Sequence, residues 1–160
     1  MDQIINHFVS KHINKHPNIW DNFNELVENM SNQPCHSLSD IKKYKTTKLK
    51  GDLFELFCQK YLSSVMKMDY VWLYNKVPES VRNHLSITKR DFGIDIIAQK
   101  SNQYYAIQCK YRKRNKSRKT TIPWKQLATF YGQVSVSGPF EKHIVMANAD
   151  YINHIGKKTE

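Results

Sequence analysis

Cysteines are scarce in this sequence and their arrangement excludes two kinds of stabilised fold. Only 3 are present among 160 residues. They are odd in number and widely spaced, and no two form a CxxC pair, so neither a disulfide framework nor a structural zinc site is expected. A reducing intracellular compartment, such as the cytoplasm, is the expected location.

Long apolar runs and a secretory leader are also missing. The longest apolar stretches, residues 92–98 and 143–149, are interrupted by Asp95 and Asn148 and are far shorter than a membrane span. Residues 1–8 lack both a basic lead and a continuous apolar segment. We therefore expect neither a membrane helix nor a secretory signal.

Motifs of two common enzyme classes are absent as well. Without a GxxxxGK[ST] sequence, a nucleotide-driven enzyme has no support. Serine hydrolase chemistry has no GxSxG sequence, and cysteine hydrolase chemistry is disfavoured because Cys109 is expected to face the core. The chain length fits one compact domain of ordinary size and leaves no room for an additional motor ATPase.

Positive charge is what the sequence has in excess. Lys and Arg number 25 against 14 Asp and Glu, which gives a formal net charge of +11. This balance favours a phosphate-rich partner, and nucleic acid is the prediction. The stretch after Tyr111 holds no apolar residue, so it is not a membrane-surface helix, although a solvated basic loop or a localisation signal remains the alternative. Its six basic residues, the basic segment, are Arg112, Lys113, Arg114, Lys116, Arg118 and Lys119.

The spacing of apolar residues predicts an α/β fold with the order helix, three strands, helix, strand, preceded by two further helices. The expected helices are residues 4–13, 19–30, 47–65 and 123–133, and the expected strands are residues 70–77, 91–99, 104–111 and 142–147. A polar stretch over residues 31–39 separates the first two helices from the rest. We expect residues 1–45 to form a helical extension packed on a core domain of residues 46–160.

Four turn-forming polar residues, 100–103, separate the second and third strands, which are therefore expected to form a hairpin. With the turn centred on residues 101–102, Asp95 opposes Gln108. Opposed residues have Cβ atoms about 4.5–5.5 Å apart, so the two side chains can reach one ion. Lys110 faces the same way, because side chains alternate along a strand.

Two readings of these polar residues remain open. The other face of the third strand, residues 105, 107, 109 and 111, is expected to be buried, which leaves Gln108 and Lys110 on the polar face of an ordinary strand. Asp95 fits this reading less well. It lies between Ile94 and Ile96, where a carboxylate pays a desolvation cost unless a cation or a donor meets it.

The sequence DFGID at residues 91–95, followed by QCK at residues 108–110, resembles the signature of PD-(D/E)XK nucleases, specifically the Mrr-like branch in which Gln replaces the usual acid. GDLFE at residues 51–55 resembles the upstream GxxxE element of these nucleases. The resemblance covers residues 47–148 and implies a restriction-endonuclease-like core with an extra N-terminal helical pair. The PD dipeptide is absent, since Ile94 precedes Asp95.

This resemblance implies a metal-dependent endonuclease that hydrolyses phosphodiester bonds of DNA, with DNA favoured over RNA. Similar domains occur in restriction systems and at the N-termini of large helicases, including viral ones, so a helicase motor is an implied partner. The implied ligands of Mg²⁺ or Mn²⁺ are Glu55, Asp95, Gln108 and the backbone carbonyl of Cys109. Lys110 is the implied catalytic lysine, which orients the attacking water or offsets charge on the phosphate. The alternative is a DNA-binding or targeting module of the same fold without catalysis.

The basic segment begins two residues after Lys110, so the sequence places it where a phosphate backbone would pass. Trp124 and Lys125, at the start of the next helix, are further candidates for stacking or phosphate contacts. Packing of Trp124 beside Pro123 is an equal alternative. The basic segment, Trp124 and Lys125 together make up the expected nucleic-acid-binding residues.

Overall fold

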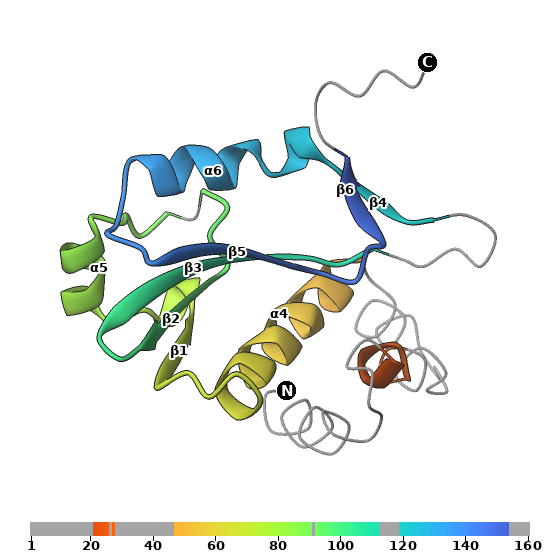
Figure 1. The fold of residues 1–160 in the computed structure, drawn as a ribbon, viewed down its shortest axis with the longest axis horizontal. Helices are drawn as coiled ribbons and strands as arrows, with labels where there is room; N and C mark the ends of the chain where they lie inside the picture. The colour runs from red at the N-terminus through yellow and green to blue at the C-terminus, as the bar shows by residue number, and fades with distance from the viewer. Residues whose placement is uncertain (1–20, 26, 28–46, 91, 113–118, 154–160) are drawn as a thin grey trace, which may run out of the picture. The chain divides into compact units, whose positions relative to one another are not determined.

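The computed structural model describes residues 21–25, 27, 47–90, 92–112 and 119–153 (Figure 1). The chain divides into two compact units, residues 1–67 and residues 68–160. The expected helix at residues 4–13 and the expected polar stretch at residues 31–39 lie outside the described residues. The expected domain boundary between residues 45 and 46 also lies outside the described residues, and it stays a prediction.

In the first unit the main described element is helix α4, Thr47–Ser64, which agrees with the helix expected from apolar spacing. Residues 21–25 and 27 are helical too, as expected. The ring of Phe23 contacts the rings of Phe54 and Phe57, with centroids 4.9 Å and 5.0 Å apart. All three side chains are fully buried, so aromatic packing joins the two helical segments.

The second unit is built on a four-stranded sheet with the order β1-β2-β3-β5 (Figure 1). Its strands are β1, Tyr70–Leu73, β2, Ile96–Lys100, β3, Gln103–Lys110, and β5, Lys142–Ala147. The pairs β1–β2 and β2–β3 are antiparallel, whereas β3–β5 is parallel. A parallel pair needs a long crossover connection, and helix α6, Ala128–Ser135, lies within it along one face of the sheet.

The hairpin between β2 and β3 has the register expected from its turn. Ile97 pairs with Ala106 and Ile96 with Ile107. The central turn residues, Ser101 and Asn102, both have positive φ angles, 49° and 63°. Such angles belong to the tight turn whose twist matches that of two antiparallel strands. The turn therefore determines which residues of β2 and β3 face each other.

Two expected strands are shorter in the structure. The first ends at Leu73, where the 3-10 helix η1, Tyr74–Lys76, begins. An unexpected helix, α5, Glu79–Leu85, follows and ends at Ser86, whose φ of 53° is left-handed. Pro78 and the acidic Glu79 at its start are ordinary helix-initiation signals. The second expected strand, residues 91–99, begins only at Ile96 as β2.

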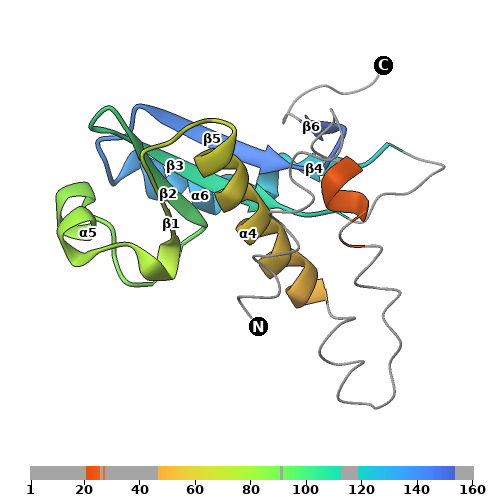
Figure 2. The same ribbon diagram turned by 90° about the horizontal axis from the view of Figure 1, so that it is seen from below.

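The helix expected over residues 123–133 is also divided. Strand β4, Thr121–Pro123, and the 3-10 helix η2, Trp124–Gln126, precede α6. Strand β6, Tyr151–Asn153, pairs with β4 in parallel and forms a second, two-stranded sheet (Figure 2). Pairing between β4 and β6 joins segments far apart in the sequence, and neither is long enough to show a period of its own.

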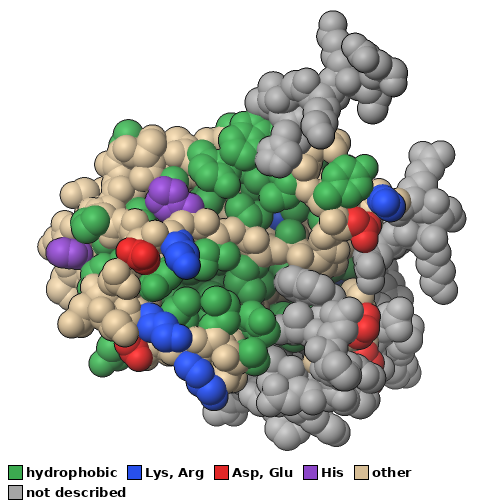
Figure 3. Space-filling view, in the orientation of Figure 1, with side chains coloured by type: hydrophobic (Ala, Val, Ile, Leu, Met, Phe, Trp, Pro, Cys, Tyr) green, Lys and Arg blue, Asp and Glu red, His purple; other side chains and the backbone are tan. Residues whose placement is uncertain are grey.

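One apolar core lies inside the second unit, between the main sheet and the segments that include α5 and α6. Ile97 of β2, Ala106 of β3, Leu85 of α5 and Phe130 of α6 are all fully buried in it. Hydrophobic side chains also remain visible on the face of the molecule in Figure 3, as on most proteins. Among the described residues, no helix is both long enough and apolar enough to span a membrane.

Candidate active site

Asp95 is held beside Gln108 by hydrogen bonds to both neighbours of that residue in β3. The Asp95 N–H donates to the carbonyl of Ile107 at 3.0 Å, and the Cys109 N–H donates to Asp95 Oδ2 at 2.6 Å. These bonds explain why β2 begins at Ile96, the residue after Asp95. The Asp95 side chain, rather than a backbone carbonyl of that strand, accepts the Cys109 N–H. A hydrogen bond to a carboxylate is strong and directional, so the half-buried Asp95 has a defined orientation.

Gln108 is buried in β3, with only 1% of its surface exposed. Its Oε1 is buried and has no hydrogen-bond partner among the described residues. The expectation that Gln108 lies on a solvent-facing side of the strand was wrong. Phe130 and Val134 of α6 pack with Ala106 on this face, so the face lies inside the core. An unpaired buried acceptor costs about 1–3 kcal/mol unless a ligand meets it.

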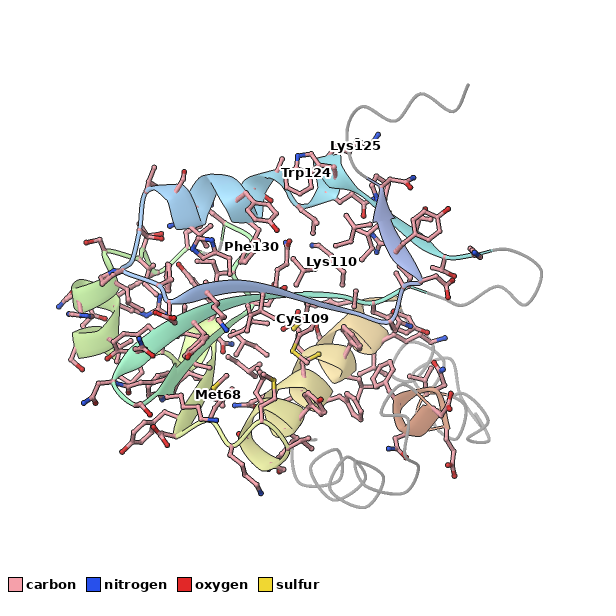
Figure 4. The ribbon with its side chains drawn as sticks, viewed as in Figure 1. Met68, Cys109, Lys110, Trp124, Lys125 and Phe130 are labelled. Atoms are coloured by element: carbon pink, nitrogen blue, oxygen red, sulfur yellow. The ribbon has the colours of Figure 1, made fainter. Side chains whose placement is uncertain are left out.

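Lys110 is half-buried and shares its face of β3 with Ala106 and Gln108, because side chains alternate along a strand. Figure 4 shows Lys110 on the α6 side of the sheet and Cys109 on the opposite side. The Cys109 side chain is buried, 8% exposed, as expected for a residue that faces a core. The strand thus directs an amide and an ammonium to one face, beside the backbone position held by Asp95.

The oxygen donors of this site are of mixed type. No group of three His, Cys, Asp or Glu side chains able to hold a metal occurs in the part of the chain that the structure describes. A carboxylate next to an amide oxygen that lacks a partner nevertheless fits a hard cation such as Mg²⁺ or Mn²⁺, which binds oxygen. Glu55 is half-buried on α4 in the first unit, and its part in the site stays a prediction.

Gly93, two residues before Asp95, is required by the local backbone. Its φ is +104°, and a Cβ atom placed on it would lie 3.0 Å from the N of Phe130 and 3.1 Å from Oγ1 of Thr129. The immediate role of Gly93 is to let the start of α6 approach the segment that carries Asp95.

A buried arginine, which sequence reasoning missed, stabilises the loop that leads to this segment. Arg82 is 6% exposed and donates from Nε to the carbonyl of Val77 at 3.1 Å and from Nη1 to that of Thr88 at 2.7 Å. Its Nη2 donates to the carbonyl of Tyr74. The Tyr74 N–H in turn donates to the carbonyl of Asp95 at 2.8 Å. Nothing in the local sequence distinguishes this arginine from a solvated one on a helix.

Both ends of the basic segment are attached to one turn between β5 and β6. Asn148 donates from Nδ2 to the Arg112 carbonyl at 2.7 Å, and its Oδ1 accepts the Arg112 N–H at 2.6 Å. At the other end, Asp150 Oδ2 accepts the Thr120 N–H at 2.6 Å, while the Thr120 carbonyl accepts the Asp150 N–H at 2.8 Å. These two polar residues were not expected to matter, because their partners are about thirty or more positions away.

The expected nucleic-acid-binding residues differ in their surroundings. Arg112 is half-buried and donates from Nη1 to the carbonyl of Tyr111 at 2.9 Å, while Lys119 is exposed. Burial raises the pKa of the hydroxyl of Tyr111, the residue after β3, by desolvation. The remaining four, Lys113, Arg114, Lys116 and Arg118, lie outside the described residues.

Trp124 and Lys125 lie in η2, before α6 (Figure 4). The Trp124 ring stacks on that of Tyr131, with centroids 4.7 Å and planes 21° apart. Trp124 thus has a packing role, with Tyr131 as the ring partner, whereas the sequence had suggested packing beside Pro123. Its contact with nucleic acid stays a prediction. Lys125 is exposed.

The mixed sheet, its crossover helix and the polar residues at the open end of the β2–β3 hairpin form an α/β domain that is compatible with a restriction-endonuclease-like fold. The Mrr_cat_2 family model, described as a restriction endonuclease, matches residues 63–159, more than half of the chain, and includes Asp95, Gln108 and Lys110. The chain therefore belongs to this Mrr-like restriction endonuclease family. No curated protein and no solved structure matches it. Glu55 precedes the matched range.

Proposed function

We propose that the protein is a divalent-metal-dependent endonuclease that hydrolyses phosphodiester bonds of DNA. The observation that carries this proposal is the buried Gln108 Oε1, which has no partner among the described residues, beside a carboxylate that is hydrogen bonded to the next residue. Two oxygens of this kind at the open end of a hairpin supply half of a hard-cation site. Membership of a restriction endonuclease family supports DNA as the substrate.

In this proposal Asp95, Gln108 Oε1 and the Cys109 carbonyl hold Mg²⁺ or Mn²⁺, and Glu55 adds a second carboxylate. When bound, such an ion supplies Lewis acidity at the phosphate and an activated water. Gln108 contributes no negative charge, so a contribution from Glu55 matters more than it would in a site with two acidic strand residues. Lys110, on the same strand face, orients the water or offsets the charge that develops on the phosphate.

DNA binding in this proposal uses the basic segment together with Lys125. The Asn148 and Asp150 hydrogen bonds support it, because they attach both ends of the segment to the turn after β5, whose partner strand β3 carries Gln108 and Lys110. Phosphate contacts of this kind give affinity and register, without sequence readout. Trp124 would contribute to DNA binding only through ring surface that Tyr131 leaves free.

We extend the proposal to the setting in which the nuclease works. Action next to a helicase motor, in the same or an associated polypeptide, follows from the resemblance to helicase-linked nuclease domains. A reducing compartment, the cytoplasm or the site of viral or bacterial DNA, is supported by the scarcity of cysteines, which number only 3 and form no CxxC pair.

The test of the proposed function is cleavage of supercoiled plasmid by the full chain with Mg²⁺ or Mn²⁺, followed on a gel. We expect Asp95→Ala and Lys110→Ala each to lower the cleavage rate by about 100-fold or more, because each removes a group that acts on the reacting phosphate or its cation. Binding to duplex DNA in EDTA, measured by fluorescence anisotropy, should change little.

Lys142→Ala is the matched control, because Lys142 is an exposed lysine on β5, opposite Tyr105 rather than Lys110. Cleavage by this variant should equal that of the wild type. If the wild type cuts no form of DNA, and the Asp95 and Lys110 variants bind DNA as it does, the protein is the non-catalytic DNA-binding module instead.

A further inference from the structure

We propose that Phe92 and Arg90 form a base-stacking site at the rim of the candidate active site, close to Asp95 in the chain. The preferred substrate is then DNA with unstacked bases beside the cleaved phosphate. This inference rests on the proposed function, because it takes DNA as the partner. It adds a binding site and a substrate class, single-stranded or locally unpaired DNA, that the candidate catalytic residues do not define.

Phe92 combines exposure with a specific neighbour. Its side chain is 43% exposed, one of the few large hydrophobic residues in the described ranges that remain on the surface. Exposure alone is weak evidence of a binding site, because much of any protein surface is apolar. The guanidinium carbon of Arg90, however, lies 5.4 Å from the centroid of the Phe92 ring, within the range of a cation–π contact. The pair therefore offers a ring for a base and a cation for a phosphate.

The backbone that leads to Phe92 is stabilised by hydrogen bonds. The Tyr74 hydroxyl donates its one proton to the carbonyl of Thr88 at 2.6 Å, and the carbonyl of Arg90, 3.2 Å away, is the second acceptor within reach. Thr88 Oγ1 also donates to the Arg90 carbonyl at 2.9 Å, and the buried Arg82 donates to the Thr88 carbonyl. These hydrogen bonds hold the backbone of Thr88 and Arg90 in place before binding, and a pre-organised contact keeps more of its interaction energy as affinity.

The position of Phe92 is also defined. The next residue, Gly93, packs against the backbone of Phe130 at the start of α6. Phe130 and Lys110 both lie on the α6 side of the sheet (Figure 4), so the backbone of Gly93, next to Phe92, lies on the side toward which Lys110 points. Three residues further on is Asp95, so the Cα atoms of Phe92 and Asp95 are at most about 11 Å apart. An unpaired strand bound at both points would therefore have only a few nucleotides between the cleaved phosphate and the base on Phe92.

The chemistry of the rim favours an unpaired strand over two other occupants. Lys89 and Arg90 are exposed and cationic, so Phe92 is not part of an apolar patch of the kind that a protein partner covers. In a duplex the faces of the bases are stacked on each other and closed to a side chain. A single strand presents these faces, and aromatic residues beside cations are the usual platform for them.

The experiment compares three oligonucleotide probes of equal length, in EDTA so that none is cut. They are a single strand, the same strand with abasic sites in place of bases, and the duplex. We expect Phe92→Ala to weaken binding to the single strand by about 5- to 100-fold and to leave the abasic strand and the duplex within about 2-fold. Phe92→Trp should bind the single strand at least as well as the wild type.

Tyr70→Ala is the matched control, because Tyr70 on β1 is even more exposed, at 59%, and is expected to have no part in binding. Unchanged single-strand binding by Phe92→Ala would overturn the inference, and so would equal losses on all three probes or an equal loss in Tyr70→Ala. A loss confined to the duplex would overturn it too, in favour of a wedge between base pairs. Plasmid cleavage by the wild type and its loss in Asp95→Ala test the proposed function separately.

Discussion

Replacement of Gln108 by methionine tests whether its amide oxygen awaits a ligand. The side chain is 1% exposed, and its Oε1 lacks a hydrogen-bond partner within the described part of the protein. Such an orphan acceptor costs about 1–3 kcal/mol. Methionine is similar in length and adapts to irregular core spaces, so Gln108→Met removes this cost with little steric change. We expect the metal-free variant to be more stable than the wild type by about 1–2 kcal/mol.

Urea-induced unfolding in EDTA measures this difference. A domain of this size has a free energy of unfolding of about 5–15 kcal/mol, so the expected gain is a sizeable fraction of it. With a urea dependence of about 2 kcal/mol per molar, the midpoint should rise by roughly 0.5–1 M. Gln126→Met is the control, because Gln126 is an exposed glutamine of η2, and its midpoint should stay close to that of the wild type.

If Gln108 is a metal ligand, addition of Mn²⁺ makes the wild type more stable than Gln108→Met. A cation that binds only the folded protein stabilises it by about 2.7 kcal/mol at a concentration of 100 times its Kd. The wild type should gain this stability, and Gln108→Met should gain clearly less. A metal-free variant that is less stable than the wild type would refute the idea of an orphan oxygen. Equal stabilisation of both proteins by Mn²⁺ would refute its role as a ligand.

Two further substitutions address the backbone around Asp95. Arg82→Met should lower the free energy of unfolding by about 3–5 kcal/mol in urea, because it leaves three carbonyls, those of Tyr74, Val77 and Thr88, without their charged donor. Arg82→Lys should retain only part of the stability that Arg82→Met loses, because an ammonium lacks the planar fork of donors of a guanidinium. A wild-type free energy of unfolding in Arg82→Lys would contradict this reasoning. Gly93→Ala should lower the free energy of unfolding by about 2–4 kcal/mol and slow plasmid cleavage, because the φ of Gly93 is +104° and a Cβ would meet Phe130. A urea midpoint equal to that of the wild type would contradict this, because it would mean that α6 moves to make room for the Cβ.

Elements that depend on local patterns were predictable from the chain alone. The strand Lys142–Ala147 has the expected bounds, and helix α4 ends within one residue of its expected end. Register in the hairpin followed from Ser101 and Asn102, because a two-residue turn determines which strand positions face each other. The family was also predictable, because each of its motifs is a short run of residues in the sequence, and the match over residues 63–159 confirms the family.

Other features were set by contacts between distant segments. The early end of the first strand depends on Tyr74, whose N–H pairs with the Asp95 carbonyl and whose own carbonyl accepts from Arg82. The strands β4 and β6 have only three residues each and exist through their mutual pairing. Sequence spacing carries no record of such partners, because local propensity is weak compared with packing and hydrogen bonding in the folded chain.

By itself, the sequence determined the α/β class, the hairpin that brings Asp95 near Gln108, and the excess of basic residues after Lys110. These follow from side-chain alternation, turn chemistry and charge, which act over a few residues. Only the tertiary structure decided that Gln108 is buried without a partner, that Gly93 serves the approach of α6, and that Asn148 attaches the basic segment to the end of β5. Burial and hydrogen-bond pairing depend on what the rest of the folded chain places around a side chain.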